Sequence, residues 1–185
     1  LPGQNSKGFS GDAEIGDLPL ETCDTINGAW GYHAEDKNFK STKQLIHYLV
    51  RSAGQSANLL LNVGPRPDGT IQEEFVERLE AMGKWLDQYG ETVYAYQAGP
   101  SPPQEWGVTT ESDGTVYLHL LEPPAKAGEK WIELNQTGHL KVDALRHVNT
   151  GSELEFELNA TGDLRILLPE AERNPIDTIL IVASQ

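Results

Sequence analysis

The stretch ANLLLNVGPRPDGTI, residues 57–71, predicts the fold of the first half of the chain. Its apolar run, Leu59 to Leu61, ends abruptly in Asn, Gly, Pro and Asp. Such a run, bounded by turn residues, is typical of a buried strand that leads into a loop. The stretch lies between two segments of helical periodicity. It therefore predicts the last strand of an α/β barrel, a fold whose active sites lie at the carboxyl ends of the strands.

The two flanking segments have the spacing of amphipathic helices. Ser41 and Gln44 predict a capping box, after which apolar residues recur at helical spacing up to Gly54. The second helix is expected to bury one face and to end at Gly90 as a C′ glycine. That face consists of Phe75, Leu79, Met82 and Leu86. Upstream, residues 18–23 predict a short strand that reaches the mouth of the barrel, and residues 1–17 an exposed loop.

Beyond the Pro-rich linker at residues 98–103, the periodicity changes from 3.6 to 2. We therefore expect two domains: residues 1–98, the C-terminal part of a (β/α)8-like barrel, and residues 99–185, an all-β sandwich. A turn is predicted at Asp113-Gly114. The predicted strands of the sandwich are residues 115–121, 130–134, 139–148, 153–159, 163–168 and 177–183.

The composition disfavours several classes of partner. A net charge of −14, from 28 acidic and 14 basic residues, argues against nucleic acid and anionic membrane surfaces. The single cysteine, Cys23, excludes an internal disulfide bond. The five histidines show no metal-ligand spacing, so neither a metal nor a cofactor is predicted.

Five motifs occur in an order that resembles the α-L-fucosidases of glycoside hydrolase family 29. They are residues 57–71, Glu21-Thr22-Cys23, Ala29-Trp30-Gly31-Tyr32, Gly83-Lys84-Trp85-Leu86 and Tyr89-Gly90-Glu91-Thr92-Val93-Tyr94. The resemblance implies a retaining exo-hydrolase that releases terminal α-L-fucose from glycans through a covalent fucosyl-enzyme. It also implies that this chain is a C-terminal fragment, that the nucleophilic Asp lies upstream, and that the protein is secreted, periplasmic or lysosomal.

The same resemblance suggests three site residues. Glu21 matches the glutamate of a W-E-x-C-like segment, with Leu20 in place of Trp, and is the candidate acid/base. The alternatives are that Glu21 is a buried structural carboxylate and that the acid precedes Leu1. Trp30 is expected to contact the fucose methyl group, although Ala29 replaces the usual Ser and the ring could instead anchor the loop. His33 is placed at the edge of the site.

Other residues carry weaker predictions. Asn62, at the end of its strand, is expected to hydrogen-bond a neighbouring loop or the sugar. Asp12, Glu14 and Asp17 are lesser acid candidates.

Two alternatives to a fucosidase remain open at this stage. One is a non-catalytic carbohydrate-binding module formed by the sandwich, and the other is an inactive barrel relative that only binds glycans. The aromatic residues of the second domain, Trp131 among them, are scattered along the sequence. No convergent polar cluster is evident there, so a structural role is favoured for the sandwich.

Overall fold

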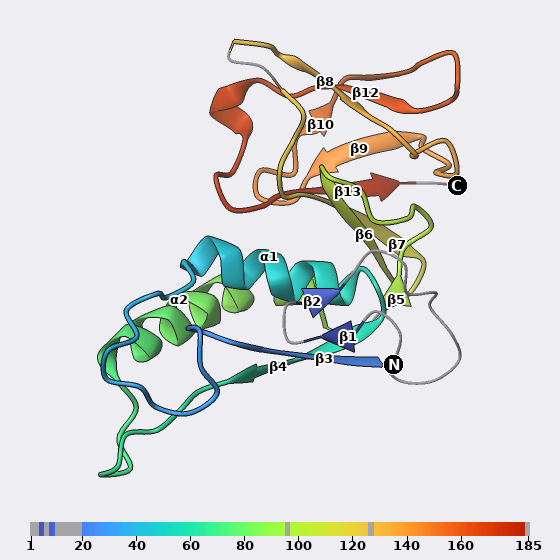
Figure 1. The fold of residues 1–185 in the computed structure, drawn as a ribbon. Coiled ribbons are helices and arrows are strands. Elements are labelled where there is room, and N and C mark those ends of the chain that lie inside the picture. Colours follow the sequence, from blue (N-terminus) through green and yellow to red (C-terminus); the bar gives the residue numbers. More distant parts are fainter. Residues whose placement is uncertain (1–3, 6–7, 10–19, 95–96, 126–127, 184–185) are drawn as a thin grey trace. The chain divides into compact units, whose positions relative to one another are not determined.

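The computed structural model describes residues 4–5, 8–9, 20–94, 97–125 and 128–183. The chain divides into two compact units, Leu1–Tyr94 and Ala95–Gln185, which are described separately (Figure 1). The division falls four residues before the boundary expected at residue 98. Strand β5 (Gln97–Ala98) pairs with β6 (Gly107–Ser112), and this pairing places it in the second unit.

The first unit contains a strand-helix-strand-helix sequence. Its elements are β3 (Leu20–Thr25), α1 (Thr42–Ala53), β4 (Ala57–Asn62), α2 (Glu73–Tyr89) and the 3-10 turn η1 (Gly90–Thr92). β3 and β4 pair in parallel, from Leu20 opposite Ala57 to Thr25 opposite Asn62. Both helices lie on the same side of this strand pair in Figure 1. The strand predicted after Ala57 is confirmed, and its parallel pairing is that of a β/α unit.

Helix α1 begins and ends where the sequence predicts. The Gln44 amide donates to Ser41 Oγ at 3.2 Å, and the Ser41 amide donates to Gln44 Oε1 at 2.8 Å, so the capping box is confirmed. Gly54 caps the carboxyl end.

Helix α2 differs from the prediction in two ways. Leu79 is 40% exposed, because the buried stripe of α2 runs through Phe75, Met82, Trp85 and Tyr89, and the half-buried Arg78 lies on that side with its guanidinium 5.2 Å from the Phe39 ring centroid. Gly90 has a right-handed φ of −57° and the chain continues into η1, so it is not a left-handed C′ glycine. A Cβ at Gly90 would lie 2.4 Å from Cε2 of Tyr94. The absence of a Cβ at Gly90 lets the exposed Tyr94 ring pack against the backbone there, and the backbone conformation itself does not require glycine.

A short antiparallel pair occupies part of the N-terminal segment that was expected to be a loop. It consists of β1 (Gln4–Asn5) and β2 (Gly8–Phe9). The lesser acid candidates Asp12, Glu14 and Asp17, and positions 18–19 of the predicted strand, lie outside the described residues.

The described part of the second unit forms two antiparallel sheets, ordered β10-β9-β13-β7-β6-β5 and β11-β12-β8. The remaining strands are β7 (Thr115–Leu120), β8 (Trp131–Leu134), β9 (Ala144–His147), β10 (Glu153–Leu154), β11 (Phe156–Leu158), β12 (Leu164–Leu167) and β13 (Thr178–Ala183). Side chains from both sheets share one apolar core, including Leu118 and Leu180 from the larger sheet and Ile132 and Leu164 from the smaller. The second unit is therefore a two-sheet sandwich.

Three strand predictions for the sandwich are corrected. The strand expected over residues 139–148 is limited to β9. The one expected over residues 153–159 divides into β10 and β11, which belong to different sheets. Leu158 pairs with the buried Leu164 but is 56% exposed, because β11 is the edge strand of its sheet. β6 was not predicted. It is joined to β7 by the expected Asp113-Gly114 turn, whose φ values are 48° and 77°.

Candidate active site

Two loops leave the same edge of the first unit. Because β3 and β4 run parallel, their carboxyl ends lie together, and residues 26–41 and 63–72 extend from that edge. The first loop carries Trp30 and His33, and the second carries Gly64. In α/β folds, side chains that act on a ligand come from loops at this edge.

The first loop is held against the end of β4 by a hydrogen bond and by a close approach of the two backbones. Asn62 Nδ2 donates to the Trp30 carbonyl oxygen at 2.7 Å, which confirms that Asn62 binds a neighbouring loop. A Cβ built on Gly64 would lie 2.5 Å from both Gly31 C and Tyr32 N, so only glycine permits this approach. The segment Trp30–Tyr32 is therefore held against the end of β4.

This anchoring leaves the aromatic rings of the segment accessible. Trp30 is 48% exposed and Tyr32 39% exposed, and the His33 side chain is also exposed. The Trp30 contact that holds the loop is made by its backbone carbonyl, whereas the indole remains accessible. An exposed indole on an anchored backbone is suited to contact a ligand.

A partly buried ion pair lies at the base of the first loop. Asp24 is only 5% exposed, and Lys40 Nζ lies 3.2 Å from Asp24 Oδ1 and 2.7 Å from the Thr25 carbonyl oxygen. Arg78 Nε donates to the Lys40 carbonyl oxygen at 2.6 Å, which ties the loop to α2. Burial and the neighbouring charge of Asp24 raise the pKa of Tyr48 to about 12. Through its contacts with Asp24 and Thr25, Lys40 holds the end of the first loop against the end of β3, the strand that precedes the loop.

The Asp36 carboxylate organises the middle of the loop. It accepts hydrogen bonds from the backbone amides of Gly28, at 2.9 Å, and Asn38, at 3.0 Å. The Asn38 bond is the main cause that lowers the pKa of Asp36 below its ordinary value of 3.8, and the Gly28 bond adds to it. Because the folded pKa is lowered, these contacts stabilise the loop above that ordinary value and are lost as the pH falls through the folded pKa.

We expect Asp36→Asn to remove this acid transition, because an amide does not titrate in that range. The amide signal of Gly28 should titrate with Asp36 in the parent chain, below the ordinary value of 3.8, as the pH is lowered from 7 to 2, and should not do so in the variant. NMR spectra recorded across that range test this. Asp87→Asn, on the exposed face of α2, is the control and should leave the transition in place. A Gly28 transition that persists in Asp36→Asn would contradict the assignment.

Glu21 lies at the other end of β3 from these loops. It is the second residue of the strand, which extends to Thr25, two residues beyond the strand predicted over residues 18–23. The four residue steps from Glu21 to Thr25 correspond to about 13 Å at roughly 3.3 Å per step. Its side chain is exposed in this chain, with Oε1 4.0 Å from Cys23 Sγ. Trp30 and His33 thus share one loop, and Glu21 is separate from them.

The described residues contain no group of three or more His, Cys, Asp or Glu side chains that could hold a metal ion. No helix within the described ranges is both long and apolar enough to cross a membrane.

A sequence model of the family described as Alpha-L-fucosidase matches residues 5–91, which include both loops of the edge. Tissue α-L-fucosidase of Bos taurus is 34% identical over 159 residues, which is 83% of this chain and 33% of that protein. The chain belongs to the α-L-fucosidase family. The resemblance predicted from the five motifs is confirmed.

Other relatives agree with this assignment. Plasma α-L-fucosidase of Homo sapiens is 35% identical over 112 residues, 56% of this chain and 24% of that protein. The crystal structure of Thermotoga maritima α-fucosidase in complex with fucose superposes with a TM-score of 0.77 at 30% identity, over 92% of this chain and 41% of that one. Isoenzyme 1 from Paenibacillus thiaminolyticus gives 0.77 at 29% identity, over 91% and 40%. The chain thus spans about a quarter to a third of these curated relatives.

Proposed function

We propose that this chain forms part of a retaining exo-α-L-fucosidase that releases terminal α-L-fucose from glycans. The observation that carries the proposal is the exposed Trp30 ring, held at the carboxyl edge of a parallel strand pair by Asn62 and Gly64. Its support from outside the chain is the likeness to α-fucosidases, one of which was solved in complex with fucose.

In this proposal Trp30 recognises the C6 methyl group of fucose. A flat apolar ring is stabilised by contact with a methyl group, whereas the hydroxymethyl group of a galactose-type sugar would lose water there. A difference of this kind corresponds to about 1–3 kcal/mol. His33, three residues further along the same exposed loop, supplies ring nitrogens that can hydrogen-bond a sugar hydroxyl.

The strand pair is proposed to be the last two strands of a (β/α)8-like barrel. One face of the pair carries Glu21, Cys23 and Leu60, and Leu60 is 50% exposed in this chain. In such a barrel, that face is the interior and is filled by side chains of the other strands. Upstream strands would cover Leu60 and supply the nucleophilic Asp. The retaining mechanism places this Asp about 5–5.5 Å from the acid/base carboxyl.

The test is hydrolysis of an aryl α-L-fucoside by the full-length protein, with product configuration followed by NMR. We expect turnover in which α-L-fucose is the first product, because two successive inversions retain the configuration. β-L-Fucose as the first product would refute the retaining mechanism. Binding of the fucoside without turnover would instead support the non-catalytic glycan-binding alternative.

Glu21 is the acid/base in this proposal, and its distance from the strand end makes this the role that the geometry supports least. If Glu21 donates the proton, Glu21→Gln lowers kcat for glycans with poor leaving groups by about 10²–10⁴-fold. Azide should then restore turnover of an activated aryl fucoside. Glu77→Gln, at an exposed position of α2, is the control. Unchanged hydrolysis of poor leaving groups in Glu21→Gln would place the acid elsewhere.

A further inference from the structure

The three-stranded sheet of the second unit has an outer face that is not part of the sandwich core. Side chains alternate along β8 and β12, so that Ile132 and Ile166 are buried in the core while Trp131, Glu133 and Arg165 lie on the other face. In the register, Arg165 is opposite Glu133 on one side and opposite Glu157 on the other. The pairing therefore aligns a carboxylate, a guanidinium and a second carboxylate across three strands.

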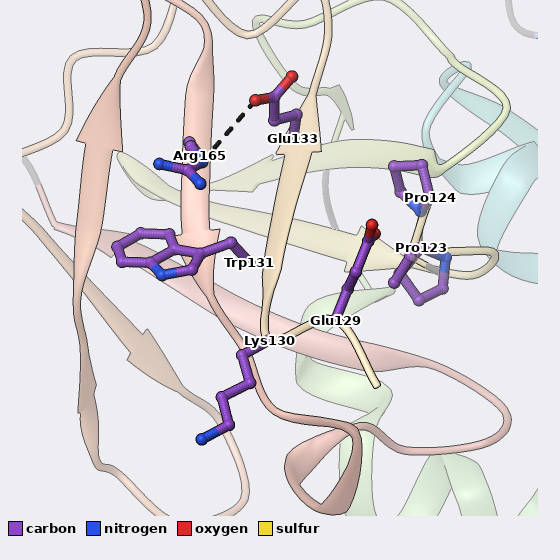
Figure 2. Close-up of a pocket in the computed structure, with 8 residues that line it drawn as sticks. Pro123, Pro124, Glu129, Lys130, Trp131, Glu133 and Arg165 are labelled. Atoms are coloured by element: carbon purple, nitrogen blue, oxygen red, sulfur yellow. Dashed lines mark ion pairs between the residues drawn. The ribbon is translucent and has the colours of Figure 1, made fainter. Parts of the chain in front are cut away.

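Arg165 contacts three side chains on this face, those of Glu157, Glu133 and Trp131. Arg165 Nη1 lies 3.0 Å from Glu157 Oε2, and Nε lies 3.7 Å from Glu133 Oε1. The guanidinium carbon lies 4.8 Å from the centroid of the Trp131 ring. Figure 2 shows Arg165 pointing toward both Trp131 and Glu133. Because these contacts restrain long side chains before any ligand arrives, less conformational entropy is lost on binding.

Trp131, Glu133 and Arg165 border an open hollow. Its volume is about 700 Å³, within the range of small-ligand sites. It is lined by Pro123, Pro124, Ala125, Glu129, Lys130, Trp131, Glu133 and Arg165. A second hollow of about 570 Å³ shares Pro124 and Glu133 with it and also includes Asn135 and Asn159. The two together have room for more than one sugar ring.

We propose that this face, the Trp131 surface, binds neutral oligosaccharides. A sugar ring presents C–H groups on its faces and hydroxyl groups around its rim. The indole and the prolines can pack against the C–H groups of the sugar. The carboxylates and the guanidinium can form paired hydrogen bonds with its hydroxyl groups. Carboxylates outnumber cations along the two hollows, where Lys130 and Arg165 lie among Glu105, Glu122, Glu129, Glu133, Glu157 and Asp163. Anionic ligands are disfavoured, because the surface has no excess of positive charge.

The inference goes beyond the proposed hydrolysis of fucosides. The Trp131 surface would hold a glycan by its non-fucosylated part, and it needs no catalytic residue of the first unit. The four tryptophans of the chain, Trp30, Trp85, Trp106 and Trp131, give four indole N–H signals that report separately on the two units.

The experiment titrates the full-length protein that contains this chain with lacto-N-neotetraose, a neutral tetrasaccharide without fucose, and follows the indole signals of these four tryptophans in ¹H–¹⁵N spectra. We expect the Trp131 indole signal to shift in a saturable manner below 10 mM sugar, while the Trp30 and Trp85 signals do not move. Trp131→Ala and Arg165→Met should weaken binding at least tenfold, as measured by calorimetry. Leu158→Ala, at an exposed apolar position of the same sheet outside the hollow, should bind normally.

Three results would overturn the proposal: no saturable shift of Trp131, undiminished affinity in Trp131→Ala, or a Trp131 shift that requires an anionic sugar such as a heparin tetrasaccharide. If Trp131→Ala does not fold, the affinity of Arg165→Lys for the tetrasaccharide is the test, because this variant keeps the positive charge but removes the planar guanidinium group. Since the probe lacks fucose, failure of this binding leaves the aryl fucoside test unaffected. Absence of fucoside turnover equally leaves this test intact.

Discussion

Replacing Trp30 by alanine is expected to lower kcat/KM for an aryl α-L-fucoside by about 10- to 100-fold in the full-length protein, with little change for the corresponding galactoside. The indole is exposed and its backbone carbonyl is held by Asn62, so removal of the ring leaves the loop anchored. The lost activity therefore reflects the missing contact between the indole and the methyl group, which fucose has and galactose lacks. Initial rates for both glycosides, measured in parallel, give the ratio that tests this.

Trp30→Phe is the matched variant. It keeps a flat apolar ring on the same backbone, and we expect it to retain most of the preference for fucose. Equal losses for both sugars in Trp30→Ala would show that Trp30 positions the loop and does not select the methyl group. An unchanged ratio together with unchanged rates would remove Trp30 from the site.

Gly64→Ala is expected to abolish most of the fucosidase activity, by about 100-fold or more, and to destabilise the protein by about 1–3 kcal/mol. The added Cβ would lie 2.5 Å from Gly31 C and Tyr32 N. Both are backbone atoms, so no side-chain rotation relieves the clash. The segment Trp30–Tyr32 must move, and its hydrogen bond to Asn62 is strained or lost.

Gly83→Ala is the control for this prediction. Gly83 lies inside α2, and a Cβ there would meet nothing within 4 Å. We expect it to stabilise the helix by about 0.5–1 kcal/mol and to leave hydrolysis unchanged. Thermal melting and kcat are measured for both variants. If Gly64→Ala behaves like Gly83→Ala, the close approach of the two loops is not required for activity.

Features defined by neighbours in sequence were predicted well. The capping box at Ser41 and Gln44 depends on residues three apart, and the turn at Asp113-Gly114 depends on two adjacent residues. The strand before Gly64 was recognised because its apolar run is short and ends in turn residues. In each case the interaction that selects the local conformation is contained within a few residues.

Strand ends and exposed faces were predicted less well. β3 extends to Thr25, so Glu21 lies near its beginning. Residues 153–159 alternate like one strand, yet they cross between two sheets at Glu155 and leave Leu158 exposed. Alternation reports which residues share a face, but the partner strands determine which face is covered and where pairing stops.

The amino-acid sequence alone determined the family of this protein, its division into an α/β part and a β-rich part, and the segment Trp30–Tyr32 as a candidate contact for the sugar. Only the tertiary structure brought Gly64 against Gly31, Lys40 against Asp24, and Arg165 between Glu133 and Glu157. The physical reason is range. The features that the sequence determined follow from short motifs and local periodicity. The contacts that only the tertiary structure decided depend on backbone approach and strand register between segments distant along the chain.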